Sequence, residues 1–333
     1  MVTASGAQNF LLSTRNLKTH FYTFEGIVRA VDGVSFSISS GQTYGLVGES
    51  GCGKSITALS ILGLIPLPQG RIVDGEILFE GRNLLALSRQ EMRRIRGNRI
   101  AMIFQEPMTS LNPVFTIGRQ ISEALRLHRA MNTKEAWQET VSLLDRVGIP
   151  SPQRRAGDFP HRLSGGMRQR AMIAMAMACR PELLIADEPT TALDMTIQAQ
   201  ILDLIQQLKV DFNMAMLLIT HNFGVIAETA ERTGVMYAGR IVEEAETRRL
   251  FSAPVHPYTQ GLLRSLPRIG EKVHNGRKKL NEIPGIVPRL TENRRGCAFA
   301  PRCSASKPEC RRSEPEFTEI GDGHRVRCFN GSA

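Results

Sequence analysis

A glycine-rich segment carries the residues best suited to holding a phosphate group. It runs Gly48-Glu-Ser-Gly-Cys-Gly-Lys-Ser55 and fits the pattern GxxxxGKS. Strand-like residues 42–47 precede it and helix-like residues 56–64 follow, so backbone N–H groups and a helix N-terminus point at one anion. In such a loop Lys54 reaches the β- and γ-phosphates, and Ser55 offers a hydroxyl to Mg²⁺. A chance glycine-rich turn is the alternative, and the flanking strand and helix argue against it.

A second feature is an apolar run that ends in two acids. Residues 183–186 are followed by Asp187 and Glu188, as expected of a buried parallel strand that delivers charge to its C-terminal end. We expect Asp187 to orient the Mg²⁺ shell and Glu188 to polarise a water for in-line attack on the γ-phosphate. Taken alone, the segment also fits an edge strand that turns at two acids.

A third segment, Leu163-Ser-Gly-Gly-Met-Arg-Gln-Arg170, precedes a Met- and Ala-rich helix expected over 167–179. Alone, Ser-Gly-Gly is equally well explained as a helix N-cap. The segment is similar to the LSGGQ signature of ABC-type ATPases. The order of phosphate loop, Gln105, signature, acidic strand, Ala192-Leu-Asp194 and His221 also resembles that family.

The resemblance implies a head-to-tail ATP sandwich. Ser164 and Gly166 of one subunit would close on the γ-phosphate held by the phosphate loop of another, bringing a second helix N-terminus to the same phosphates. Hydrolysis would then require a dimer or a related partner subunit. The nucleotide-binding residues implied are Phe21, Gly48, Glu49, Ser50, Gly51, Cys52, Gly53, Lys54, Ser55, Ile56, Thr57, Ser164, Gly165, Gly166, Asp187 and Asp194.

Two further polar residues complete the implied catalytic set with Glu188. His221 follows the strand-like residues 215–220 and matches the switch histidine that contacts the γ-phosphate and the catalytic water, although Asn222 replaces the Asp usual after it. Outside this series a lone histidine is more often a surface or structurally satisfied residue. Gln105 matches the glutamine that links the Mg²⁺ site to a mobile helical subdomain. The implied Mg²⁺ ligands are therefore Ser55, Gln105 and Asp187.

Three positions of the implied nucleotide site are less defined. Phe21 is the aromatic expected to stack on adenine, with Tyr22 and Phe24 as alternatives. Cys52 occupies a variable position of the loop and is interpreted as a small residue and not as a redox centre. Ile56 stands where many relatives carry Thr for the α-phosphate, so that contact is either missing or made by Thr57.

Other segments resemble the peptide-importer branch of the family. These are Glu106-Pro-Met-Thr-Ser-Leu-Asn-Pro113, the residues from Glu188 to Asp194, and Val255-His-Pro-Tyr-Thr-Gln-Gly-Leu-Leu263. The resemblance implies an ATPase that powers import of dipeptides or oligopeptides. Nickel and glutathione importers share much of this pattern and stay open as alternatives. A soluble ABC ATPase of DNA repair or translation is disfavoured by the single set of motifs and the lack of sustained heptads.

Four cysteines near the C-terminus form a separate feature. No two are separated by the roughly two to four residues of a zinc knuckle, and four thiolates also suit a [4Fe–4S] cluster. The resemblance favours the cluster, because several relatives hold one in this region, with zinc or unligated thiols as alternatives. The expected ligands are Cys297, Cys303, Cys310 and Cys328.

Composition limits the partners and the location. The net charge of the 333 residues is +10, but residues 271–312 contain eleven Lys and Arg against four Asp and Glu, so the remainder is nearly balanced. We therefore expect no nucleic-acid partner. The basic group Lys278, Lys279, Arg294 and Arg295 would face either the anionic inner leaflet, a permease or solvent.

No apolar run approaches the roughly 18–20 residues of a membrane span, and the first thirty residues lack an apolar signal core. We expect a peripheral protein at the cytoplasmic face of the inner or plasma membrane. Its implied partners are a second ABC ATPase subunit, identical or related, two transmembrane permease subunits and, indirectly, an external peptide-binding protein.

The expected fold is α/β, with a P-loop, RecA-like ABC ATPase core. The ATPase domain would span residues 1–253, with an inserted helical subdomain at about 106–168. A C-terminal extension of the oligopeptide-transporter type, with the four-cysteine tail, would span 254–333.

Overall fold

The structure is a computed structural model. It describes residues 10–106, 110–191, 193–266, 283–288, 290–291 and 295–331. These residues belong to two compact units that alternate along the chain. Unit 1 comprises Met1–Ser13, Ser37–Thr43 and Ile77–Ile219, and unit 2 comprises Thr14–Phe36, Tyr44–Glu76 and Thr220–Ala333.

Three short parallel strands form the sheet of unit 1. They are β6 (Ile100–Ile103), β7 (Leu183–Asp187) and β8 (Ala215–Ile219), with β7 between the other two. Every residue of the three strands is buried, as their continuous apolar runs predict. The register pairs Ile103 with Ala186 and Asp187 with Ile219, so the acidic end of β7 lies at the carboxyl edge of this sheet.

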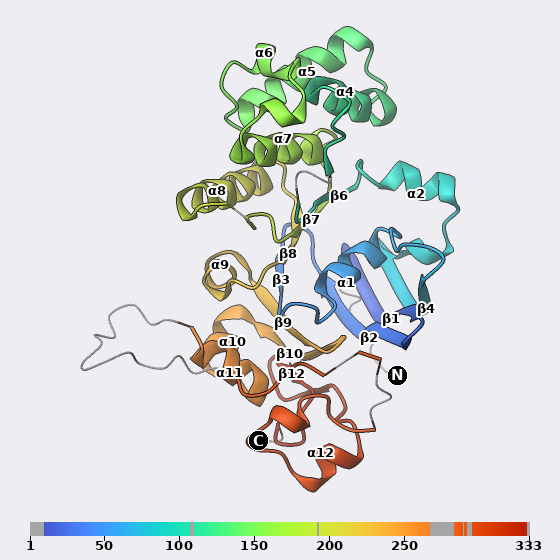
Figure 1. The fold of residues 1–333 in the computed structure, drawn as a ribbon, viewed down its shortest axis with the longest axis vertical. Helices are drawn as coiled ribbons and strands as arrows, with labels where there is room; N and C mark the ends of the chain where they lie inside the picture. Colours follow the sequence, from blue (N-terminus) through green and yellow to red (C-terminus); the bar gives the residue numbers. More distant parts are fainter. Residues whose placement is uncertain are drawn as a thin grey trace, which may run out of the picture. The chain divides into compact units, whose positions relative to one another are not determined.

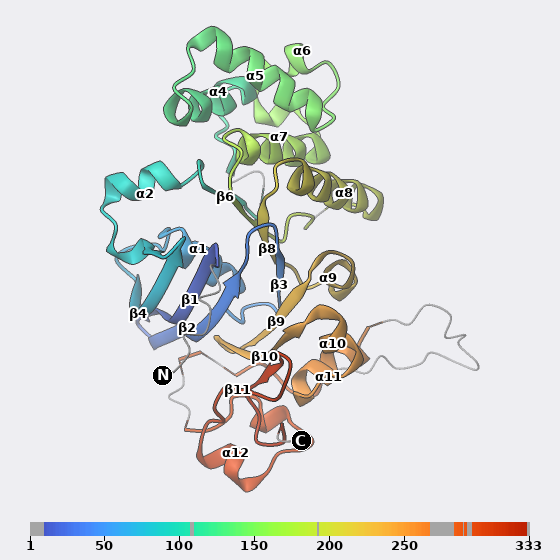
Figure 2. The same ribbon diagram turned by 180° about the vertical axis from the view of Figure 1, so that it is seen from behind.

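Most α-helices of unit 1 begin at a residue whose side chain caps the helix. Asn132 and Glu135 form a capping box at the start of α5, and Thr116 caps α4. Figure 1 and Figure 2 both show α4, α5, α6 and α7 gathered in one group. The helices of unit 1 are α2 (Arg89–Ile95), α4 (Ile117–His128), α5 (Thr133–Arg146), α6 (Pro152–Ala156), α7 (Gly165–Met177) and α8 (Met195–Asp211), with 3₁₀ turns at Leu84–Ala86 and Pro160–Arg162 and a short strand β5 at Arg82–Asn83.

In unit 2 the chain passes from β3 (Thr43–Val47) through the phosphate loop, residues 48–53, into α1 (Lys54–Ile61). β3 pairs in parallel with β9 (Arg232–Tyr237), which forms an antiparallel pair with β10 (Arg240–Glu246). The strand β12 (Arg325–Val326) adds to β10, and β11 (Thr318–Glu319) adds to β12. The C-terminal residues therefore extend the sheet that contains the phosphate-loop strand.

The remaining strands are long and exposed along part of their length. β1 lies between β2 and β4 in a sheet that is separate from the one that contains β3, β9 and β10. Their bounds are β1 (Leu12–Thr23), β2 (Gly26–Ile38) and β4 (Gly70–Phe79). The other helical segments of unit 2 are α9 (Phe223–Thr229), α10 (Thr247–Ser252), α11 (Pro257–Arg264), α12 (Pro308–Arg312) and the 3₁₀ turn Ala300–Arg302.

Some sequence-based expectations fall on residues that the structure does not describe. These are residues 107–109 of the segment that begins at Glu106, Ala192, and the basic residues Lys278, Lys279 and Arg294. Within the described ranges, no helix is both long and apolar enough to cross a membrane.

Candidate nucleotide site

The phosphate loop adopts a backbone that depends on glycine. Gly53 has φ 109° and immediately precedes α1, and a Cβ atom built there would lie 2.2 Å from the carbonyl oxygen of Ala30. A Cβ atom on Gly48 would lie 2.2 Å from the carbonyl oxygen of Met236. Any larger residue would force these neighbouring segments apart. The loop is thereby held at the N-terminus of α1, where backbone N–H groups favour an anion.

Lys54 places a positive charge inside this loop. Its side chain is buried, and its Nζ donates hydrogen bonds to the carbonyl oxygens of Gly48 at 2.8 Å and of Glu49 at 3.1 Å. Both acceptors are neutral, whereas a buried ammonium is best stabilised by a negative charge. The loop therefore has the chemistry of a phosphate site, and the assignment of its residues to ATP stays a prediction.

The neighbouring loop residues differ in how far solvent reaches them. Cys52 is fully buried, and burial raises the pKa of its thiol, so the side chain packs as a small neutral group. Thr57 is also buried, and its hydroxyl donates to the carbonyl oxygen of Gly53 at 3.0 Å. Ser50 and Gly51 are exposed, while Ser55 and Ile56 are half-buried.

The three aromatic candidates for adenine stacking lie at the end of β1 or just after it. Phe21 is half-buried and lies against the backbone of Gly70, where an added Cβ atom would be 2.8 Å from its ring. Tyr22 is exposed and has the guanidinium of Arg71 at 5.7 Å from its ring centroid. Phe24 is fully exposed. The assignment of Phe21 to adenine stays a prediction.

The acidic pair lies at the carboxyl end of β7 in unit 1. Asp187 is buried, and Glu188 adopts φ 45°, a left-handed conformation that is uncommon for a residue with a side chain. The N–H group of Glu188 donates to the carbonyl oxygen of Ile219 at 2.8 Å, which holds this backbone in place. Backbone strain of this kind is concentrated at functional sites, because the surrounding structure must maintain it.

Two side chains orient the carboxylate of Glu188. Its Oε2 accepts a hydrogen bond from Nε2 of Gln105 at 3.1 Å and another from Oγ1 of Thr191 at 2.9 Å. The structure therefore brings together Gln105 and Glu188, two of the three predicted catalytic residues. Thr191 was not predicted as a site residue, although it lies in the segment from Glu188 to Asp194 that resembles the peptide-importer branch.

The signature segment forms the start of α7. Ser164 is the N-cap, and its Oγ accepts a hydrogen bond from the N–H group of Met167 at 3.3 Å. Ser164 and Gly165 are exposed and Gly166 is half-buried, so this helix N-terminus is accessible. Gln169 in the next turn is buried and donates to the carbonyl oxygen of Pro189, which connects the signature helix to the loop after Glu188.

Asp194 and Asn222 both act as helix caps. The Oδ1 of Asp194 accepts from the N–H group of Ile197 at 2.9 Å at the start of α8. The Oδ1 of Asn222 accepts from the N–H group of Gly224 at 2.9 Å at the start of α9. An amide oxygen caps as well as a carboxylate, which explains how Asn replaces Asp here. His221, in unit 2, is exposed immediately before this cap.

Glu49 is held by two residues of the C-terminal extension that the sequence did not identify as site residues. The guanidinium of Arg302 pairs with both of its carboxylate oxygens, at 2.8 and 3.0 Å. The hydroxyl of Tyr258 accepts a hydrogen bond from the N–H group of Glu49 at 3.0 Å. The phosphate loop thus has structural support from beyond the ATPase motifs.

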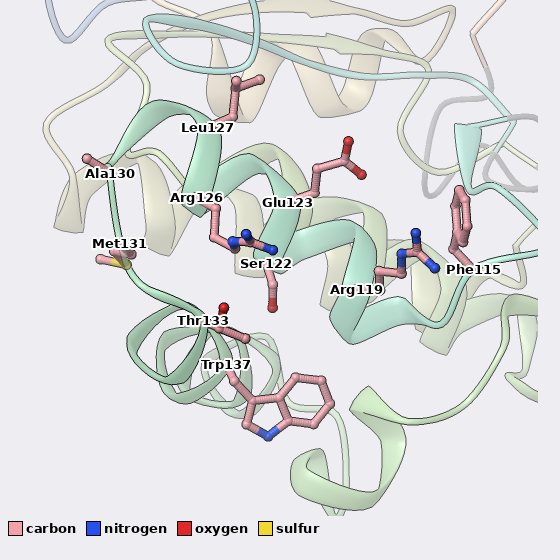
Figure 3. Close-up of a pocket in the computed structure, with 10 residues that line it drawn as sticks. All are labelled: Phe115, Arg119, Ser122, Glu123, Arg126, Leu127, Ala130, Met131, Thr133 and Trp137. Atoms are coloured by element: carbon pink, nitrogen blue, oxygen red, sulfur yellow. The ribbon is translucent and has the colours of Figure 1, made fainter.

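The helices of unit 1 also form an open groove with a volume of about 770 Å³. Figure 3 shows Arg119, Glu123 and Arg126 along α4, with Trp137 projecting from α5 below them. The ring of Phe115 has the guanidinium of Arg119 at 4.0 Å from its centroid. This groove carries none of the predicted nucleotide residues.

The prediction of a [4Fe–4S] cluster is wrong. None of the four tail cysteines forms a disulfide, and no group of three or more His, Cys, Asp or Glu side chains among the described residues is placed to hold a metal ion. Burial raises the pKa of the Cys297 thiol to about 11. Cys297, Cys303, Cys310 and Cys328 instead line a cavity of only about 10 Å³.

Two family descriptions match the chain. "ABC transporter" matches residues 31–191, and "Oligopeptide/dipeptide transporter, C-terminal region" matches residues 242–310. Among solved structures, the dimeric ATP-binding cassette MJ0796 in a post-hydrolysis state with ADP and Pi aligns with TM-score 0.64 and 27% identity. That alignment covers 71% of this chain and 99% of the other.

Relatives match along almost the whole chain. A probable peptide ABC transporter ATP-binding protein of Sinorhizobium fredii is 54% identical over 324 residues, covering 97% of this chain and 96% of the relative. The oligopeptide transport ATP-binding protein AppD of Bacillus subtilis is 52% identical, and the dipeptide transport ATP-binding protein DppD of Escherichia coli is 47% identical, each over 96% of both chains.

The fold and the motifs define an ABC-type ATPase, which confirms the predicted α/β P-loop class. The chain belongs to the family of peptide ABC transporter ATP-binding proteins, and its residues 242–310 match the oligopeptide/dipeptide transporter C-terminal region. The boundaries at residues 106, 168 and 253 stay predictions.

Proposed function

We propose that this chain is the ATP-hydrolysing subunit of an ABC importer for dipeptides or oligopeptides. The observation that carries the proposal is its similarity to relatives named for peptide, oligopeptide and dipeptide transport over 96–97% of its length. The match to the oligopeptide/dipeptide C-terminal region at residues 242–310 supports the same substrate class.

The residues of the phosphate loop fit Mg²⁺ and ATP. The buried Nζ of Lys54 donates to neutral carbonyl oxygens, and the loop lies at a helix N-terminus, both of which favour a polyphosphate. The hydroxyl of Ser55 and the carboxylate of Asp187 are oxygen ligands of the kind that Mg²⁺ prefers, with Gln105 as the third proposed ligand. When bound, Mg²⁺ would neutralise charge that develops on the phosphates.

In the proposed reaction Glu188 acts on the attacking water. Its carboxylate polarises the water, while Gln105 and Thr191 hold that carboxylate in a fixed orientation through their hydrogen bonds. His221 would contact the γ-phosphate and the same water. Phe21 would stack on adenine, and the backbone of residues 48–55 would hold the phosphates. Because Ile56 stands where many relatives carry Thr, the contact to the α-phosphate would either be made by Thr57 or be missing.

We propose that a second ABC ATPase subunit, identical or related, completes each site. The exposed N-terminus of α7, with Ser164, Gly165 and Gly166, would close on the γ-phosphate bound to the partner subunit, with Asp194 nearby at the start of α8. The similar cassette MJ0796 was solved as a dimer bound to ADP and Pi, which supports this arrangement.

The remaining proposed partners are two transmembrane permease subunits, which receive peptide from an external binding protein. This chain would then be peripheral, at the cytoplasmic face of the membrane.

The groove of α4 and α5 supports a partner surface, because Leu127 is 73% exposed and Trp137 is 41% exposed there (Figure 3). Trp137→Glu should weaken recovery of the permeases with this chain, whereas Met195→Glu, also on an exposed apolar residue, should not.

Uptake by cells tests the proposed function directly. Cells would carry either the wild-type chain or Glu188→Gln, and uptake of labelled dipeptide, longer peptide, glutathione and nickel would be compared. We expect only peptide uptake to fail in the variant. Loss of nickel or glutathione uptake alone would reassign the substrate, and unchanged uptake of all four would contradict an importer role.

A further inference from the structure

The phosphate loop contains an acidic residue at a position where negative charge is unfavourable. Glu49 is the second residue of the loop, beside Gly48, and its side chain is 28% exposed. A free carboxylate here would repel the phosphates that the loop is built to hold, and the effective dielectric near a protein surface is well below that of water. Some other group must therefore neutralise Glu49 if ATP is to bind well.

Arg302 satisfies this requirement. Its side chain is only 5% exposed, and its guanidinium forms two parallel hydrogen bonds with the carboxylate of Glu49, Nη1 to Oε2 at 2.8 Å and Nη2 to Oε1 at 3.0 Å. This two-point geometry is the strongest form of an ion pair between side chains, because it fixes both orientation and charge. The hydrogen bonds with Glu49 raise the pKa of Arg302, so the guanidinium stays charged.

The guanidinium itself is held by further contacts within unit 2. Its remaining donors reach the carbonyl oxygen of Pro284 at 3.0 Å, that of Ile283 at 3.3 Å and the hydroxyl of Tyr237 at 3.4 Å. Arginine has five N–H donors, and each has an acceptor here. Such complete satisfaction makes Arg302 a rigid support for Glu49.

A second contact from the extension holds the backbone of the same loop residue. The N–H group of Glu49 donates to the hydroxyl of Tyr258 at 3.0 Å. The ring of Tyr258 is buried against Tyr237 and Phe299, with centroid separations of 4.6 and 5.4 Å. Tyr258 therefore cannot move away from Glu49 without disrupting this aromatic cluster.

We propose that Arg302 is a positioning residue of the nucleotide site, through which the C-terminal extension neutralises Glu49 and holds the phosphate loop ready for ATP. The inference rests on the proposed ATPase function, and it assigns to the extension a role in nucleotide affinity. Because Arg302 acts through Glu49, its removal should matter only while Glu49 is charged.

A double-mutant cycle on the full-length chain tests this dependence. The dissociation constant for Mg·ATP would be measured by calorimetry for wild type, Arg302→Met, Glu49→Gln and the double variant. Loss of the charge-assisted pair in Arg302→Met should weaken ATP binding by about tenfold. The double variant should recover most of that affinity, because the neutral amide that replaces the carboxylate no longer repels phosphate.

Two further variants separate this role from general support of the fold. Arg302→Lys keeps the charge and loses the two-point geometry, so its affinity for ATP should fall between those of wild type and Arg302→Met. Glu314→Gln removes a different ion pair of the extension, Glu314 with Arg240 at 2.7 Å, and should leave ATP affinity unchanged. Circular dichroism of each variant checks that the chain is folded.

The outcomes are distinct. If wild type and Arg302→Met bind ATP equally well, the inference is wrong while the proposed function stands. If the double variant binds as weakly as Arg302→Met, or if Glu314→Gln is equally impaired, Arg302 acts only by supporting the fold and the inference also fails. If wild type does not bind ATP, both the proposed function and this inference are overturned.

Discussion

The Nε2 of Gln105 donates a hydrogen bond to Oε2 of Glu188 across 3.1 Å, although the two residues are 83 positions apart in the chain. Gln105 lies just after β6 and Glu188 just after β7, and these parallel strands are neighbours. Their carboxyl ends therefore meet at one edge of the sheet. The proposed water-polarising carboxylate is thus held by a residue that the same sheet positions.

Glu188→Gln should slow ATP hydrolysis by about 10²–10⁴-fold, because it removes the carboxylate that we propose polarises the water. ATP binding should persist, since the phosphate loop is untouched. Single-turnover hydrolysis and nucleotide binding would be measured on the same preparation. Glu139→Gln, which alters a weakly paired carboxylate on α5, is the matched control and should hydrolyse ATP as wild type. Near-normal turnover in Glu188→Gln would reject the assigned role.

Thr191→Val should lower kcat by about tenfold, because it deletes a hydrogen bond to the carboxylate of Glu188 while preserving the shape of the side chain. KM for ATP should change little, since Thr191 acts through Glu188 and not on the phosphates. Thr196→Val, on an exposed residue of α8, controls for the general effect of removing a hydroxyl. A rise in KM at constant kcat would contradict this explanation.

Gly53→Ala should destabilise the fold and abolish ATP binding. The new Cβ atom would both require the unfavourable φ of 109° and overlap the carbonyl oxygen of Ala30. Gly26→Ala shares a positive φ, 124°, but has nothing within 4 Å of its Cβ position, so it should cost only the backbone strain of about 1–3 kcal/mol. Urea unfolding would compare the two, and equal losses would mean that the close approach to Ala30 is unimportant.

His256 should make the free energy of unfolding depend on pH. Burial lowers its pKa to about 3, so the folded chain keeps the ring neutral, with Nδ1 accepting from the N–H group of Tyr258 at 3.0 Å. Below about pH 6.5, the pKa of histidine in the unfolded chain, the ring of His256 is protonated in the unfolded chain but stays neutral in the folded chain. This contribution to stability is therefore complete above about pH 6.5 and falls as the pH decreases toward 3, by about 1.4 kcal/mol per pH unit.

His256→Asn keeps an acceptor for that N–H group and cannot titrate. Urea unfolding at several pH values from neutral down to mildly acidic should show a shallower pH dependence in this variant than in wild type. Other groups near the ring, including Glu243 and its partner His324, are present in both proteins, so the difference isolates His256. His161→Asn, on an exposed residue, should retain the wild-type slope. Identical slopes for His256→Asn and wild type would contradict the explanation.

Short sequence motifs predicted most of the residues that we assign to ATP binding and hydrolysis. The glycine-rich loop, the apolar strand before Asp187 and the N-cap Ser164 each depend on neighbours within a few residues. Their geometry follows from backbone hydrogen bonding, helix capping and a continuous apolar run, all of which are encoded locally. The family resemblance and the α/β class followed from these motifs and their order.

Contacts between distant segments became apparent only in the folded chain. Arg302 and Glu49 are 253 positions apart, and neither spacing nor composition indicates that their side chains meet. The same limit applies to the cysteines: the family resemblance favoured a cluster, but whether four thiols are placed to hold a metal ion depends on how the extension folds, and among the described residues they are not. Local motifs therefore indicate which residues can bind and hydrolyse ATP. The packing of distant segments establishes what holds those residues in place, because burial and charge pairing depend on the path of the whole chain.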